Sequence, residues 1–366
     1  MSTSPLDTGH VNGTHAPRQS LLLWLALPLL FAAAVFALSR VLPLALIDFE
    51  HYYQASHALW QRQNPYGVIE FFAPPWMALV LGPLLLLPLA TASAAWVILL
   101  VVVMGGTAAL STAWLNYPLS PRTRLLVLAL AVLAPSALFV YITGQVTGLV
   151  ALAALLAAWL IATRRAEHLP WLVAAALWLT LLKPHIVALL VLLCGLELLR
   201  RRAWRVLAWL AGLCAAGALF GLAVLPAWPS ALWSAWRAGA YLGGPGLVAA
   251  GYRGLREVGV SWWLWLPLAG YVVYAWRQRG LTAYVAALAL PVGLLLVPYH
   301  RAYDQVVLFL PVLSVFAFSR GHRVGRRWLA RGLALAALVA PLAGLDLTAP
   351  MLAATAILLV VPTATD

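Results

Sequence analysis

Long apolar runs separated by short polar segments extend along almost the whole chain. The runs are about 15 to 25 residues long, and a helix that crosses a bilayer needs about 20 apolar residues. They do not alternate between apolar and polar positions, which argues against the strands of a membrane barrel. Because lipid offers the backbone no hydrogen-bond partner, the runs predict helices. The predicted spans are residues 20–42, 91–115, 124–140, 148–163, 168–182, 185–199, 204–225, 261–277, 281–298, 304–319, 328–345 and 349–363.

The sequence therefore predicts an all-α, polytopic membrane protein with about twelve transmembrane helices in one domain over residues 20–363. Residues 1–19 are polar and are interpreted as a cytoplasmic tail. Arginine clusters at 164–165, 200–205 and 320–331 mark cytoplasmic loops, since positive charge is enriched on that side of the membrane. Both termini are then expected to face the cytoplasm.

Residues 76–115 decide this topology, because two crossings there would turn every later arginine cluster outward. The charge rule favours one crossing at 91–115 and leaves 76–88 as a partial helix on the outer side. A partial helix of about 13 residues is about 20 Å long, too short to cross comfortably. Two long outer segments remain: 43–90, and 226–260, which is rich in tryptophan and suited to the headgroup level.

Composition agrees with a membrane protein, since 64% of the residues are hydrophobic, 9% are charged and the mean hydropathy is +0.94. The net charge of +13 lies in the loop clusters, where it meets anionic lipid headgroups, so the lipid bilayer and not a nucleic acid is the expected partner. Cys194 and Cys214 lie inside apolar runs and are expected to be reduced packing residues.

The outer segment 43–90 holds acids and aromatics in a chain with only 10 Asp and Glu residues. The residues after Asp48 have the spacing of a short amphipathic helix, with Glu50 on its polar face and Trp60 on its apolar face, and such a helix would lie flat on the membrane. Asp48 is either the N-cap of this helix or a catalytic carboxylate, and one role does not exclude the other. Glu50 is a second candidate carboxylate, although a solvated charge fits it equally well.

Lys183 is the only lysine among the 23 Lys and Arg residues of the chain. It lies at the predicted outer end of a span, and charges at membrane depth are commonly functional or paired. A compact ammonium suits a phosphate, whereas a lysine that snorkels to the membrane surface is the alternative.

Two further polar segments fall at outer ends of spans. Residues 141–145, which end at Gln145, either line a cavity or form a simple turn. Residues 298–304 include His300 and Arg301, which are suited to contact a phosphate. Asp304 either joins them or caps the following helix.

The ordered motifs of the chain resemble those of the membrane-embedded GT-C glycosyltransferases, and among them glycosyltransferase family 87. The resemblance covers residues 40–320, and Ala73 and Trp76 stand where the family usually has Tyr and Leu. The matching motifs are Asp48-Phe49, Tyr52-Tyr53, Ala58-Leu59, Asn64-Pro65-Tyr66, Phe72-Ala73-Pro74-Pro75, Gly144-Gln145 and Lys183-Pro184.

The resemblance implies a bacterial α-mannosyltransferase of the plasma (inner) membrane that uses polyprenyl-phosphate mannose on the extracytoplasmic face. A donor with a β linkage and an α product imply a direct inverting displacement. The acceptor would be a hydroxyl of a glycan or glycolipid. No cofactor is implied with certainty, and a divalent cation near Asp48 and Glu50 stays open.

The resemblance also implies roles for individual residues. Asp48 would take the proton from the acceptor hydroxyl. Lys183, Arg301 and His300 would bind the donor phosphate. The cavity-lining candidates are Tyr52, Tyr53, Tyr66, Gln145 and Asp304.

Three alternatives remain open at this point: another GT-C activity such as arabinosyl or glucosyl transfer, an inactive scaffold, and a transporter or lipid flippase. A transporter predicts ionisable residues along a path through the middle of the spans. The acids of this chain cluster instead in the predicted outer loops, apart from Glu197 near a cytoplasmic helix end.

Overall fold

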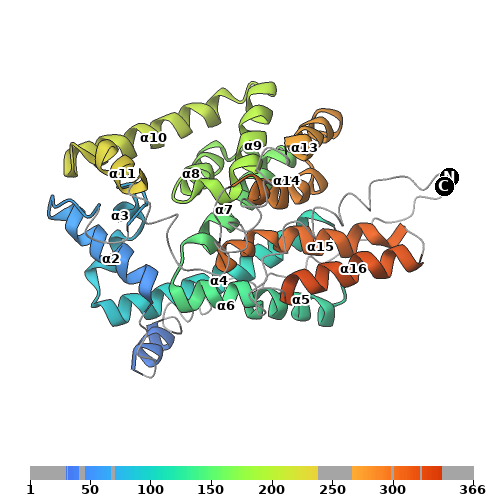
Figure 1. The fold of residues 1–366 in the computed structure, drawn as a ribbon, viewed down its shortest axis with the longest axis horizontal. Coiled ribbons are helices and arrows are strands. Elements are labelled where there is room, and N and C mark those ends of the chain that lie inside the picture. The colour runs from blue at the N-terminus through green and yellow to red at the C-terminus, as the bar shows by residue number, and fades with distance from the viewer. Residues whose placement is uncertain are drawn as a thin grey trace, which may run out of the picture.

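The computed structural model describes residues 30, 32–40, 46–66, 71–116, 118–237, 266–297, 301–321 and 324–339. In this part the chain consists of α-helices and short 3-10 helices joined by turns (Figure 1), so the predicted all-α class is confirmed there. The predicted span 349–363, most of the outer segment 226–260 and His300 lie outside the described residues.

The α-helices are α2 (Ile47–Trp60), α3 (Met77–Val80), α4 (Leu89–Trp114), α5 (Pro121–Leu133), α6 (Pro135–Thr143), α7 (Thr147–Ala162), α8 (Pro170–Thr180), α9 (Ala188–Arg200), α10 (Trp204–Val224), α11 (Trp228–Arg237), α13 (Leu266–Arg279), α14 (Ala283–Leu296), α15 (Phe309–Phe318) and α16 (Val324–Val339). The 3-10 helices are η1 (Gly82–Leu86), η2 (Arg165–Glu167), η3 (Pro184–Val187), η5 (Ala302–Leu308) and η6 (Ser319–Gly321).

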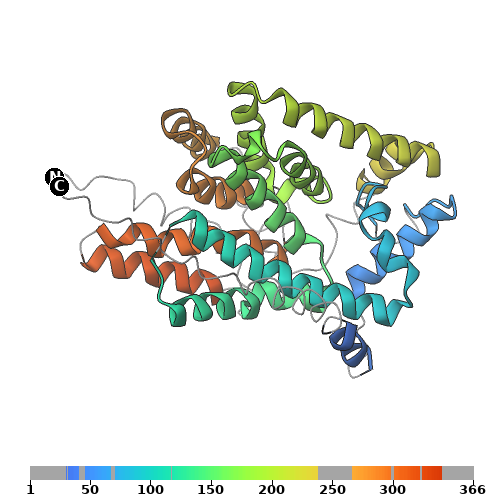
Figure 2. The same cartoon turned by 180° about the vertical axis from the view of Figure 1, so that it is seen from behind.

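Helix α7 lies at the centre of the packing. It contacts α4, α8, α9 and η5, and its buried residues include Ala151, Ala154 and Ala158. Small side chains let helix backbones approach closely in membrane proteins, which explains why an alanine-rich helix occupies this position. Helix α10 packs on α8 and forms one border of the molecule (Figure 1, Figure 2).

Two described helices, α4 and α10, are long and apolar enough to cross a membrane, and the number rises to at most 4 if each of two bent helix pairs is one span. The apolar helices at 147–162, 283–296 and 303–318 are shorter. The prediction of twelve full spans is therefore not confirmed for the described part of the chain. Helices α7 and α14 are apolar because other parts of the protein cover them, as their many buried residues show.

One proline breaks a predicted span, and another lies at the bend between two predicted spans. The run at 124–140 becomes α5 and α6, which meet at Pro135 with a bend of 47°. The runs at 168–182 and 185–199 become one helix pair bent by 120°, with Pro184 at the break. Proline lacks the backbone N–H and clashes with the preceding turn, so the helix stops before it. Lys183 thereby lies at the sharp corner that follows the end of α8.

The predicted helix at 91–115 is confirmed as the single helix α4, which covers Leu89–Trp114. The segment 76–88 before it is divided into α3 and η1, so the predicted partial helix is shorter and less regular than expected. The side of the membrane that each end faces stays a prediction.

Helix α2 corresponds to the short helix predicted after Asp48. It begins at Ile47, so Asp48 lies inside its first turn. Its N-cap is Leu46, and no side chain caps it, so the N-cap alternative for Asp48 is wrong. The predicted apolar face is only partly confirmed, because Phe49 is buried whereas Trp60 is 51% exposed. An orientation flat on the membrane stays a prediction.

Candidate active site

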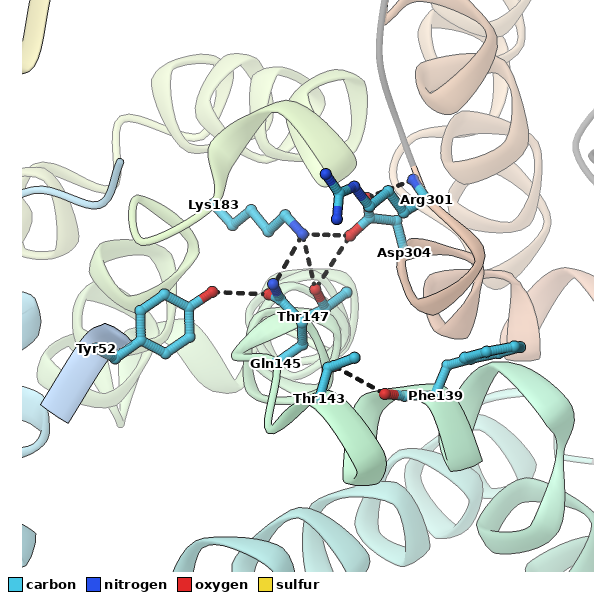
Figure 3. A network of polar contacts seen from close by, with 8 residues as sticks. All are labelled: Tyr52, Phe139, Thr143, Gln145, Thr147, Lys183, Arg301 and Asp304. Atoms are coloured by element: carbon cyan, nitrogen blue, oxygen red, sulfur yellow. Dashed lines mark hydrogen bonds and ion pairs between the residues drawn. The ribbon is translucent and has the colours of Figure 1, made fainter. Parts of the chain in front are cut away.

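Four side chains from three parts of the chain form a buried polar network (Figure 3). The Lys183 ammonium contacts Asp304 Oδ1 at 2.5 Å, Thr147 Oγ1 at 3.1 Å and Gln145 Oε1 at 3.5 Å. Thr147 Oγ1 in turn donates to Asp304 Oδ1 at 3.1 Å. All four residues are buried. An ammonium has three donors, so Lys183 uses all of them on protein oxygens.

The start of η5 fixes the Asp304 carboxylate. Arg301 is the N-cap residue, and its backbone N–H donates to Asp304 Oδ2 at 2.9 Å while Asp304 N donates to Arg301 O at 2.8 Å. The N-cap alternative for Asp304 is therefore wrong, since Asp304 is the third residue of the helix. One carboxylate oxygen accepts from the turn and the other from Lys183 and Thr147. The exposed Arg301 lies directly beside the pair (Figure 3).

The turn at Gly144 brings α2 to this network. Gly144 caps α6 with φ +73°, and a Cβ there would lie 2.5 Å from Phe49 Cβ. Its carbonyl accepts from Trp96 Nε1 at 2.8 Å, and the Trp96 ring stacks on Phe49. Glycine is needed both for the left-handed backbone and for the close approach of α2. The turn alternative for residues 141–145 is therefore confirmed, whereas the cavity lining stays a prediction.

Tyr52 links α2 to the network directly. Its hydroxyl donates to Gln145 Oε1 at 2.8 Å (Figure 3). Asp48 lies one helical turn before Tyr52 on α2. The Asp48 carboxylate is partly exposed and has no hydrogen bond or ion pair with any described residue. It is therefore available to a substrate.

The other predicted site residues lie elsewhere. Glu50 accepts from Gln54 Nε2 at 2.8 Å on the exposed side of α2. Tyr53 donates to the Leu87 carbonyl at 2.6 Å and Tyr66 to the Ala73 carbonyl at 3.0 Å, so both brace the loop. Burial raises the pKa of the Tyr66 phenol above its ordinary value, which keeps it protonated as a donor.

Two residues of the network have no counterpart in the sequence-based prediction. Thr147 bridges Lys183 and Asp304, and the Tyr303 ring lies 4.4 Å from the Lys183 ammonium in a cation–π contact. Both stand within two residues of a predicted site residue in the sequence, and that proximity is the only signal that could have pointed to them.

Among the described residues, no group of three or more His, Cys, Asp and Glu side chains is placed to hold a metal ion. Asp48 and Glu50 share α2, but Glu50 is directed to Gln54.

The sequence model of glycosyltransferase family 87 matches residues 71–298, which is more than half of the chain. The protein belongs to glycosyltransferase family 87. Gln145, Thr147 and Lys183 lie inside the matched range, whereas Asp48 and Asp304 lie outside it. No curated protein and no solved structure matches the chain.

Membership of this family, together with apolar helices long enough to cross a bilayer, indicates a membrane glycosyltransferase. Such an enzyme needs a sugar donor and an acceptor. The polar network around Lys183, with the accessible Asp48 beside it, is the candidate place where the two would meet.

Proposed function

We propose that this family 87 enzyme transfers mannose from a polyprenyl-phosphate donor to a hydroxyl of a glycan or glycolipid on the outer face of the bacterial inner membrane. The observation that carries the proposal is the position of Asp48, a partly exposed carboxylate without a hydrogen bond or ion pair to the described residues. It lies one helical turn before Tyr52, which is linked through Gln145 to Lys183. A displacement at a sugar phosphate requires a base for the acceptor hydroxyl and a cation for the leaving phosphate.

In the proposed reaction Asp48 accepts the proton of the acceptor hydroxyl as that oxygen attacks the anomeric carbon. The new bond forms between the acceptor oxygen and the anomeric carbon, and the bond between that carbon and the phosphate oxygen breaks. Polyprenyl phosphate leaves with the electron pair. One displacement inverts the anomeric configuration, so a β donor gives an α product.

The cations stabilise the charge that develops on the leaving phosphate. Lys183 is balanced by Asp304, whereas Arg301 is exposed at the edge of the same cluster. We therefore propose that Arg301 supplies the first contact with the phosphate and that His300, its neighbour in the sequence, assists it. Lys183 would add its positive charge to the same site while it stays bound to Asp304, Thr147 and Gln145.

The transporter alternative gains no support from Glu197, which lies near a predicted cytoplasmic helix end. Its buried carboxylate accepts from Arg200, Arg201 and Trp276 Nε1, so its oxygens are already saturated by α9 and α13. Such a carboxylate locks helix ends together and is poorly suited to relay ions.

A transfer assay tests the proposal. Full-length protein in membranes is given radiolabelled polyprenyl-phosphate mannose, glucose or arabinose, with lipid and glycan acceptors from a bacterial envelope. We expect mannose transfer into an α-linked product. Transfer from the glucose or arabinose donor alone would replace the proposed sugar, and no transfer from any donor would contradict the proposal.

A further inference from the structure

The amide of Gln145 has a fixed orientation. Its Oε1 atom faces the Tyr52 hydroxyl at 2.8 Å and the Lys183 ammonium at 3.5 Å. Lys183 carries donors only, so the amide atom on its side must be the oxygen. The assignment of oxygen and nitrogen, which is otherwise ambiguous in a glutamine, follows from the network itself. The Nε2 group must therefore point away from both partners.

The Nε2 group has no hydrogen-bond partner among the described residues, although Gln145 is only 5% exposed. Some side-chain N and O atoms are fully enclosed and lack a hydrogen-bond partner, but Gln145 Nε2 is not one of them, so part of its surface is accessible. The small exposed part of the side chain therefore includes a donor that the protein orients but does not use. A polar group held in this way in a buried residue is expected to have a partner.

The position of Gln145 indicates what that partner is. One neighbour, Tyr52, lies on the same helix as the candidate base Asp48, and the other neighbour is Lys183. The amide thus lies between the proposed base and the proposed phosphate cations. We propose that Gln145 Nε2 donates a hydrogen bond to a phosphate oxygen of the lipid-linked donor, a role that rests on the function proposed above.

Phosphate is favoured over a sugar hydroxyl because of the surrounding charge. The ammonium beside Oε1 polarises the amide and makes its N–H a stronger donor, since linked hydrogen bonds strengthen one another. A stronger donor gains most from a charged acceptor. Tyr52 is then a positioning residue, because its hydroxyl holds the amide in place without touching the phosphate.

Two substitutions separate the donor from the structural role. Gln145→Glu keeps an acceptor for Tyr52 and Lys183 and replaces the N–H donor with an oxygen that repels phosphate. Gln145→Met keeps the length of the side chain and removes the donor without adding charge, but it also removes the acceptor for Tyr52 and Lys183. Gln63→Glu, at an exposed position after α2, is the matched control for the change of charge.

Binding to detergent-solubilised full-length protein is measured with undecaprenyl phosphate and with undecaprenol, which has the same tail and no phosphate. We expect the wild-type protein and Gln63→Glu to prefer undecaprenyl phosphate. Both Gln145 variants should weaken its binding about tenfold to a hundredfold, the effect of losing one hydrogen bond to a charged group. Their undecaprenol binding should stay close to that of the wild type, and so should the thermal midpoint of Gln145→Glu, which keeps the acceptor for Tyr52 and Lys183.

Undecaprenyl phosphate binding by Gln145→Glu and Gln145→Met equal to that of the wild type would overturn this inference and leave the proposed function standing. Equal weakening for both lipids, with a lowered thermal midpoint, would also overturn it, because Gln145 would then be structural only. No preference for the phosphate in the wild-type protein would contradict the proposed donor and the role of Gln145 together.

Discussion

Lys183 and Asp304 are 121 residues apart in the sequence and form an ion pair whose side chains are 7% and 0% exposed. A buried charge without a partner is strongly destabilising, so each residue depends on the other. The pair joins the corner after α8 to the start of η5, and Thr147 of α7 completes the contact. The only lysine of the chain is thus part of the framework of the site as well as a candidate ligand of the substrate.

Asp304→Asn should destabilise the protein markedly. The amide leaves the Lys183 charge buried and uncompensated, a loss of about 3–5 kcal/mol. Thermal unfolding in detergent measures it, and Glu167→Gln, in η2, is the matched change at an acid without an ion pair among the described residues. A midpoint for Asp304→Asn as high as that of Glu167→Gln would contradict the buried pair.

Gly144→Ala should displace α2 from the site. The left-handed backbone costs an L residue about 1–2 kcal/mol, and the added Cβ would approach Phe49 Cβ to 2.5 Å. We expect lower stability together with loss of transfer. Gly148→Ala, whose added Cβ meets its nearest neighbour at 3.5 Å, is the control and should be tolerated. Equal behaviour of the two variants would refute the close approach.

Lys183→Ala should abolish transfer, and Lys183→Arg should restore only part of it. The ammonium is enclosed by Asp304, Thr147 and Gln145, and a planar guanidinium does not replace a point charge in so tight a site. Comparing KM for the donor with kcat separates phosphate binding from stabilisation of the transition state. Full activity of Lys183→Arg would show that any cation serves there.

The predicted topology places Gln63 and Thr123 on opposite sides of the membrane. Both residues are exposed, and the long helix α4 lies between them in the chain. Cysteines introduced there, in a background without Cys194 and Cys214, should react with a membrane-impermeant reagent from opposite sides. Reaction of both cysteines from the same side would contradict the prediction of a single crossing between them.

Several features could be predicted from the sequence because they follow from local chemistry. The long helix α4 follows from an uninterrupted apolar run. Lys183 is a candidate site residue because it is the only lysine of the chain. The left-handed turn at Gly144 is what a glycine between two apolar runs allows. These conclusions use only the composition of the chain and residues that are close together in the sequence.

Other features could not be predicted because they depend on tertiary packing. Hydropathy shows that a run avoids water, but not whether lipid or protein covers it, so buried α7 was counted as a span. The bend of 47° between α5 and α6, inside the predicted span 124–140, depends on what each half packs against. The pairing of Asp304 with Lys183, and the use of Tyr53 and Tyr66 as braces, arise between segments that no local pattern connects.

The central claim is that Asp48 is the base of a sugar transfer, and the Asp48→Asn enzyme tests it most directly. The Asp48 carboxylate contacts no described residue through a hydrogen bond or ion pair, so its replacement should leave folding and donor binding unchanged. Transfer from polyprenyl-phosphate mannose should fall about 10²- to 10⁴-fold. Near-normal transfer by Asp48→Asn would contradict the account, and loss of transfer in Glu50→Gln instead would identify Glu50 as the base.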